Sequence, residues 1–124
     1  MDEFRKRSPY EYDSDPAGEL FPNCPPEANG RRIGVRILAT LPRALAIEIA
    51  VRRTTGGPLS VAAFLLHPTF QNPIEIVNAT DDVATLTVYS EGAFTVVAIV
   101  DDGKTILSYP LLKLPGAPQW FRDN

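Results

Sequence analysis

Residues 33–51 read IGVRILATLPRALAIEIAV, and this stretch decides the fold class. Apolar side chains recur at every second position over residues 33–41 and again over residues 45–51. In an extended chain, alternate residues share one face, so each half predicts a strand that buries one of its faces. Working outward from this stretch, the same period or a short apolar run returns several times before the C-terminus.

Five further strand-like segments follow. They are rich in Val, Ile, Thr, Phe and Tyr, which suit a pleated surface, and they span residues 59–66, 74–77, 83–89, 94–100 and 105–112. Turn-forming Gly, Pro, Asn and Asp residues separate them. In particular, Asp102-Gly103 predicts a two-residue hairpin turn. No helical period persists over three turns, so the sequence predicts an all-β sandwich.

The first 30 residues differ in composition from the rest. They hold five of the 12 prolines and seven carboxylates, and they show no apolar periodicity. Such a segment buries too little apolar surface to offset the entropy lost on ordering. We therefore expect a disordered, acidic, proline-rich tail over 1–30 and one folded domain over 31–124. Deleting residues 1–28 should then leave the melting temperature nearly unchanged.

Composition narrows the function classes. Twelve Lys and Arg against 15 Asp and Glu give a net charge of −3, which disfavours a nucleic-acid surface. No apolar run is long enough to span a membrane, and the start lacks the apolar core of a signal peptide. The single cysteine, Cys24, fits a reducing compartment, so we expect a cytoplasmic protein. One cysteine and one histidine exclude a His/Cys structural zinc site within the chain, and we expect no metal or cofactor.

The sequence offers little for catalysis. His67 is the only histidine, and its candidate nucleophiles are Ser60, Ser90 and Ser108. Neither a G-x-S-x-G motif nor a phosphate-binding loop is present. We expect a protein without enzymatic activity.

A distinctive loop follows the strand at residues 61–66. It reads LHPTFQNP over residues 66–73, and a second loop, YSEGAF over residues 89–94, precedes an apolar strand. The order of hydrophobic strand, Leu-His-x-Thr-Phe and Asn-Pro resembles the signature of the YEATS domain family. The ending LKLPGAPQWF over residues 112–121 looks like the close of its prokaryotic branch. The resemblance covers residues 33–122 and implies an immunoglobulin-like β-sandwich of seven to eight antiparallel strands.

The resemblance also implies a binding site. Eukaryotic members of the family read acetylated or crotonylated lysine on histone tails. Aromatic rings from two loops sandwich the planar acyl group, while hydroxyl and backbone groups bind the amide. Carried over by motif, the ligand-binding residues are His67, Thr69 and Phe70 in the first loop and Glu91, Gly92 and Phe94 in the second. Thr69 stands where the family usually has Ser.

The main departure from the reader pattern is Glu91, because readers place Tyr or Trp at that position. A carboxylate has no ring face and favours a cationic or hydroxyl-rich ligand instead. Tyr89 could supply the missing ring, depending on the shape of the loop. His67 could equally be a loop histidine bonded to nearby backbone, and Phe70 could equally plug the end of the sandwich. Phe94 suits core packing better than ligand contact.

Two functions follow from these residues. The first is a non-catalytic recognition module that binds a small ligand or a modified lysine, such as acyl-lysine, on a protein or peptide partner. By resemblance, this module would be a sensing or adaptor component of a prokaryotic signalling or defence system. The alternative is a protein-interaction adaptor without a small-molecule pocket, which binds through a sheet edge or through the Trp120/Phe121 end.

Overall fold

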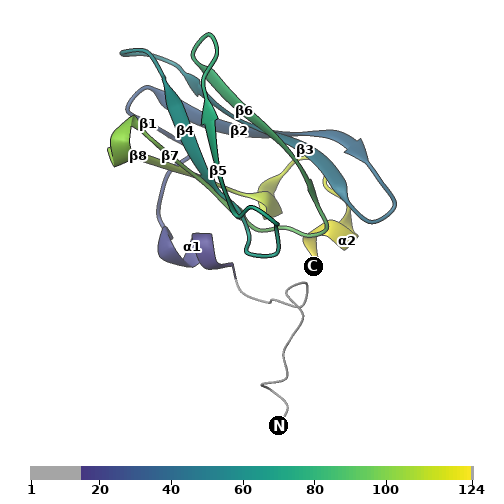
Figure 1. Cartoon of the computed structure of the whole chain (residues 1–124). Coiled ribbons are helices and arrows are strands. Elements are labelled where there is room, and N and C mark those ends of the chain that lie inside the picture. The colour runs from purple at the N-terminus through teal and green to yellow at the C-terminus, as the bar shows by residue number, and fades with distance from the viewer. Residues whose placement is uncertain (1–14, 124) are drawn as a thin grey trace.

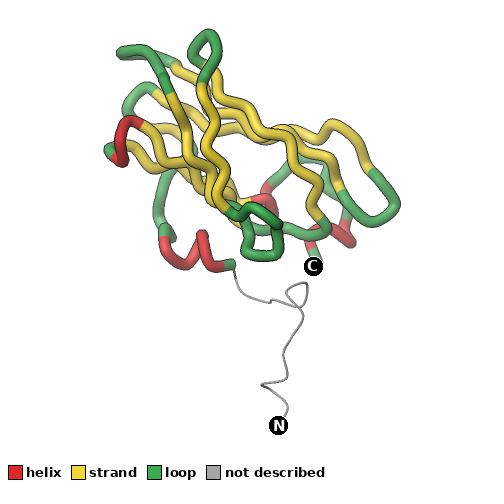
Figure 2. Tube along the Cα trace, in the orientation of Figure 1, coloured by secondary structure: helices red, strands yellow, loops and turns green. Residues whose placement is uncertain are grey.

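Two antiparallel sheets pack face to face in the computed structural model, which describes residues 15–123 (Figure 1). Within these residues there are eight strands, four in each sheet. The first sheet has the order β1 (Glu27–Ala28), β2 (Arg31–Thr40), β3 (Leu45–Arg53), β6 (Val83–Ser90). The second has the order β5 (Ile74–Asn78), β4 (Val61–Leu65), β7 (Thr95–Val100), β8 (Thr105–Pro110). The predicted all-β, immunoglobulin-like sandwich is confirmed, and Figure 2 shows that its few helical turns lie outside the strands.

The period-two stretch forms the hairpin of β2 and β3. All four alternating apolar residues of β3, from Leu45 to Val51, are fully buried between the sheets. In β2 the alternation holds only as far as Ile37, because the register with β3 shifts between Ile37 and Ala39. An extra residue at such a bulge turns the following side chains, and Leu38 is left exposed.

The core closes at one end with the C-terminal segment. Phe64 of β4 and Leu107 of β8 meet the side chains of β3 between the sheets. Beyond β8, the 3-10 helix η4 (Leu111–Lys113) and helix α2 (Gln119–Arg122) fold back over this end. Phe121 of α2 is fully buried. The C-terminal segment is therefore a short helical cap over this end of the core.

Residues 15–30 are placed differently from the expectation of a disordered tail. They form helix α1 (Pro16–Leu20), which lies against β7, and strand β1. The Asp15 carboxylate accepts hydrogen bonds from the Thr95 N–H at 2.9 Å and the Thr95 hydroxyl at 2.5 Å. The Ser108 N–H of β8 donates to the carbonyl of Pro25. Residues 1–14 of the expected tail lie outside the described part of the chain.

The turn between β7 and β8 is longer than predicted. Val100 pairs with Thr105, so four residues separate the strands rather than two. Asp101 and Asp102 both have a φ of 56° and Gly103 has a φ of 87°. Asp102 and Gly103 thus have the positive φ values that the predicted turn requires. Asp101 also has a positive φ, because its carboxylate is bonded to Arg31 outside the turn.

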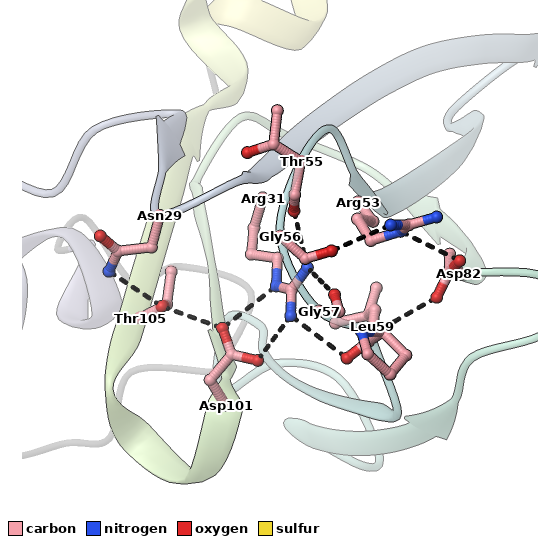
Figure 3. A network of polar contacts seen from close by, with 11 residues as sticks. Asn29, Arg31, Arg53, Thr55, Gly56, Gly57, Leu59, Asp82, Asp101 and Thr105 are labelled. Atoms are coloured by element: carbon pink, nitrogen blue, oxygen red, sulfur yellow. Dashed lines mark hydrogen bonds and ion pairs between the residues drawn. The ribbon is translucent and has the colours of Figure 1, made fainter.

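That carboxylate belongs to a polar network, which Figure 3 shows from close by. The network lies at the β7–β8 turn, at the opposite end of β7 from the candidate loop at residues 91–94. Arg31 donates to both oxygens of Asp101 at 3.1 Å, and to the carbonyls of Gly57 at 2.8 Å and Pro58 at 3.2 Å. The network ties the start of β2 to two loops and so fixes this end of the molecule.

Candidate functional site

The two loops predicted to bind a ligand leave the same end of the sandwich. Residues 66–73 connect β4 to β5, and residues 91–94 connect β6 to β7. The end of β4 pairs with the start of β7, with Leu65 opposite Val97. Because these strands are antiparallel neighbours, the loop that follows β4 and the loop that precedes β7 lie side by side. The topology therefore brings the two motifs together.

Local hydrogen bonds shape the first loop. The Thr69 N–H donates to Nδ1 of His67 at 3.2 Å, and the Thr69 hydroxyl lies 3.0 Å from the same nitrogen. The Phe70 N–H donates to the His67 carbonyl, and the Leu66 N–H donates to the Pro73 carbonyl at 2.7 Å. Since Nδ1 accepts a backbone N–H here, a neutral His67 carries its ring proton on Nε2. The imidazole of His67 thus orients Thr69, and the backbone carbonyl of His67 holds Phe70.

An aromatic cluster joins the loops. The ring centroids of Phe70 and Phe94 are 5.4 Å apart in an edge-to-face arrangement, and those of His67 and Phe94 are 6.1 Å apart. Phe94 is only 5% exposed and belongs to the core, whereas His67 and Phe70 are half-buried. The structure therefore gives Phe94 the packing role, in which it supports the two rings that reach the surface.

The second loop is held from two sides. The Ser90 hydroxyl donates to the Gly92 carbonyl at 2.7 Å, and the Ala93 N–H donates to the Phe121 carbonyl at 3.1 Å. Glu91 is exposed at the tip of this turn. Neither Ser90 nor Phe121 was among the predicted ligand-binding residues. A serine two positions before a turn glycine was the available signal for Ser90, while no local signal linked Phe121 to this loop.

Tyr89 does not take the place of the missing ring. It pairs with Ala46 on the outer face of the first sheet and is 63% exposed. Neighbouring residues of a strand point to opposite faces, so Tyr89 points away from the core that contains Val88. Within residues 15–123, the ring that packs on Phe70 is Phe94 and not Tyr89.

The sequence motif and this geometry agree with a family comparison. The model of the prokaryotic YEATS domain matches residues 46–111, more than half of the chain. The chain belongs to the prokaryotic YEATS domain family. The matched region starts in β3, ends just after β8 and includes both loops of this YEATS domain. No curated protein and no solved structure matches the chain.

Membership makes this YEATS domain a recognition module in general terms, because YEATS domains are reader modules and not enzymes. Two of the three serines considered as nucleophiles bond to nearby carbonyls: the Ser90 hydroxyl donates to Gly92, and the Ser108 hydroxyl donates to Cys24, both at 2.7 Å. Among residues 15–123, no group of three or more His, Cys, Asp or Glu side chains is placed to hold a metal ion. None of the helices described there is long and apolar enough to cross a membrane.

Proposed function

We propose that this YEATS domain binds a small ligand or a modified lysine side chain through its two end loops, without catalysing a reaction. The observation that supports the proposal is the contact of Phe94 with both His67 and Phe70. Phe94 belongs to the second loop and packs against two residues of the first loop, His67 and Phe70. This aromatic contact holds the two loops against each other.

The chemistry of the first loop suits a planar amide. Phe70 offers a half-buried ring whose orientation is fixed by the edge-to-face contact with Phe94. Thr69 and His67 of the same loop supply a hydroxyl and an imidazole, 3.0 Å apart. A flat acyl-amide can stack on a ring and exchange hydrogen bonds with such neighbours. Acetyl-lysine and crotonyl-lysine on a protein or peptide partner are therefore the first candidates.

The second loop supplies a carboxylate where a reader has a second ring. Glu91 is exposed and cannot stack on an acyl group. It can attract a positive charge, so a peptide with Lys or Arg near the modified lysine fits the two loops better than a neutral peptide. The prokaryotic family supports a sensing or adaptor role in a signalling or defence system of the cytoplasm, with the output supplied by another protein.

An amide NMR titration tests this function. The probes are peptides with acetyl-lysine or crotonyl-lysine, and the control is the same peptide with unmodified lysine. We expect saturable shifts at His67, Thr69 and Phe70 with the acylated peptides only. Absence of shifts at millimolar concentrations of both acylated peptides would contradict acyl-lysine recognition.

Substitution of Phe70 separates binding from folding. Phe70→Ala removes the stacking surface, and we expect at least a tenfold loss of affinity, about 1.4 kcal/mol. The fold should persist because the ring is only half-buried. Ile106→Ala, a half-buried apolar residue of β8, is the matched control and should keep full affinity. Equal losses in the two variants would point to a general effect on stability.

Substitution of Glu91 tests whether a second aromatic ring at this position strengthens binding of the acyl group. Glu91→Tyr restores the ring that readers have, and we expect a several-fold gain in affinity for acetyl-lysine from stacking worth about 1 kcal/mol. Glu91→Gln removes the charge without adding a ring and serves as the control. A gain in Glu91→Gln as large as that in Glu91→Tyr would show that charge, and not stacking, limits binding.

The adaptor alternative is supported only in its sheet-edge form. Phe121 is fully buried and Trp120 is half-buried, so the C-terminal end exposes little aromatic surface. By contrast, the edge strand β5 exposes two isoleucines. A sheet edge of this kind can bind another strand through its backbone.

A further inference from the structure

Strand β5 combines an exposed apolar face with a sheet edge. Ile74 and Ile76 are 60% and 72% exposed, whereas Glu75 and Val77 are half-buried on the opposite face of the strand. On the outer face of the second sheet, apolar residues of all four strands continue from Ile76 in one row, formed by Ile76, Ala63, Ile99 and Ile106. An apolar edge strand that stays exposed is typical of a surface that pairs with another chain.

The backbone of β5 is open on the side away from β4. At its two ends, the Leu66 N–H donates to Pro73 and the Ala79 N–H donates to Ser60. In an antiparallel ladder, every second residue bonds to a given neighbour. Pro73, Glu75, Val77 and Ala79 therefore face β4, and the N–H and C=O groups of Ile74, Ile76 and Asn78 point outward. No described residue bonds to these outward groups.

The other long edges differ from this one. The edge of β8 is covered, since Ser108 donates its N–H to the Pro25 carbonyl and Asn29 donates to the Thr105 hydroxyl. The exposed side chains of the β6 edge are Thr85, Thr87 and Tyr89, each of which carries a hydroxyl, instead of aliphatic side chains. Among the edges of residues 15–123, β5 is thus the one where an open backbone coincides with exposed isoleucines.

We propose that β5 pairs antiparallel with β5 of a second copy of this chain, across a two-fold axis at Ile76. The outward residues at 74, 76 and 78 are symmetric about Ile76. In this register Ile76 therefore faces the partner's Ile76, and Ile74 faces the partner's Asn78. Each facing pair exchanges two backbone hydrogen bonds. The two sheets then form one continuous sheet, and the pairing ends at a dimer because both β5 edges are used.

The charge of β5 favours this register over its neighbour. Glu75 is the only charged residue of the strand. With the axis at Ile76, Glu75 lies opposite the partner's Val77. With the axis at Glu75, the two carboxylates would face each other, which is destabilising. A strand that pairs with β5 must supply free backbone groups at alternate residues and a side chain that covers Ile76. A second copy of β5 supplies both, because its own Ile76 is β-branched and exposed.

Disulfide trapping tests the register. In a Cys24→Ser background, Ile76→Cys places the two sulfurs on facing residues, whose Cα atoms are about 5.5 Å apart and within disulfide range. Ile74→Cys lies on the same face of the strand, but in this register it faces residue 78 of the second copy. The two cysteines at position 74 are then four residues apart along the strands, about 13 Å. We expect mild oxidation to cross-link Ile76→Cys but not Ile74→Cys, and to join Ile74→Cys to Asn78→Cys in a mixture. Cross-linking of Ile74→Cys alone, or none at Ile76→Cys, would overturn the proposal.

Sedimentation equilibrium of the unmodified chain tests the dimer itself. The strand-to-strand interface is small, so we expect a monomer–dimer equilibrium in the range of about 0.1–1 mM. Ile76→Lys should abolish it without unfolding the domain, because the side chain is mostly exposed. Thr87→Lys on the β6 edge is the matched control and should dimerise normally. A monomer up to 1 mM, or a dimer that Ile76→Lys leaves intact, overturns the proposal, and neither result depends on ligand binding by the end loops.

Discussion

At the scale of single residues, Arg31 and Asp101 carry an interaction that the binding loops do not use. Arg31 is only 5% exposed, and burying an arginine is costly unless its donors are bonded. The loop carbonyls of Gly57 and Pro58 and both oxygens of Asp101 meet this requirement. Asp tolerates the left-handed φ of 56° that brings its carboxylate to Arg31. The pair therefore explains the backbone of the β7–β8 turn.

The same pair predicts a dependence of stability on pH. The hydrogen bond from Arg31 holds the pKa of Asp101 below its ordinary value. Because the folded-state pKa is depressed, the stabilisation is complete above the unfolded pKa of about 3.9 and is lost as pH falls below it. We expect Asp101→Asn to lower the free energy of unfolding by about 2 kcal/mol at pH 7. Its difference from the unmodified chain should shrink below about pH 4.

Urea unfolding at pH 7 and at a series of acidic pH values measures both effects. Asp102→Asn is the control, because Asp102 has the same φ but is exposed. We expect that control to stay within about 0.5 kcal/mol of the unmodified chain. If the difference in unfolding free energy between Asp101→Asn and the unmodified chain stays constant across the acidic range, the stabilisation does not come from the ionised Asp101 carboxylate.

At the scale of elements, α1 depends on its contact with the second sheet. A helix of five residues is too short to be stable alone. Pro16 suits its first turn, but the Asp15 carboxylate does not cap the helix and instead binds the N–H and hydroxyl of Thr95. The link between α1 and β7 is thus a tertiary hydrogen-bond pair between residues far apart in sequence.

Gly18 marks how closely α1 approaches β7. A Cβ at this position would lie 2.6 Å from Oδ2 of Asp15 and 2.9 Å from Oγ1 of Thr95. Helix propensity alone would make Gly18→Ala stabilising by about 1 kcal/mol. We expect the opposite sign, a loss of about 1 kcal/mol or more, since the added methyl crowds the Asp15 carboxylate and the Thr95 hydroxyl and disturbs their hydrogen bond. Urea unfolding measures it, with the exposed Glu19→Ala as a near-neutral control, and a gain in stability for Gly18→Ala would refute the contact.

At the scale of the whole molecule, the strands were predictable because each carries its own pattern. The alternation of β3 and the apolar run of β7 depend on local sequence, and both strands form where predicted. The β7–β8 turn and the ordered structure of residues 15–30 were not predictable in this way. They depend on pairs such as Arg31–Asp101 and Asp15–Thr95, whose partners lie 70 and 80 positions apart.

The candidate site divides along the same line. The motif at His67 and Phe70 predicted which loops matter, and the topology places them side by side. The direction of Tyr89 was not predictable, because it is set by the pairing of β6 with β3. The site residues of the two loops remain predictions until a ligand is titrated.

Truncation tests how the N-terminal segment contributes to the whole fold. Composition predicts that deleting residues 1–28 leaves the melting temperature unchanged, whereas the contacts of residues 15–28 predict a loss. The deletion removes the Asp15 carboxylate and the Pro25 carbonyl, which bond to Thr95 and Ser108. It also removes α1, which lies against β7. A loss of about 2–3 kcal/mol in the free energy of unfolding corresponds to a fall of roughly 10 °C or more in the melting temperature of a domain of this size.

Thermal denaturation followed by circular dichroism should show that fall relative to a chain that begins at residue 15, which keeps every one of these contacts. Equal melting temperatures for the two truncated chains would mean that α1 and the strand edge at β8 contribute nothing to stability.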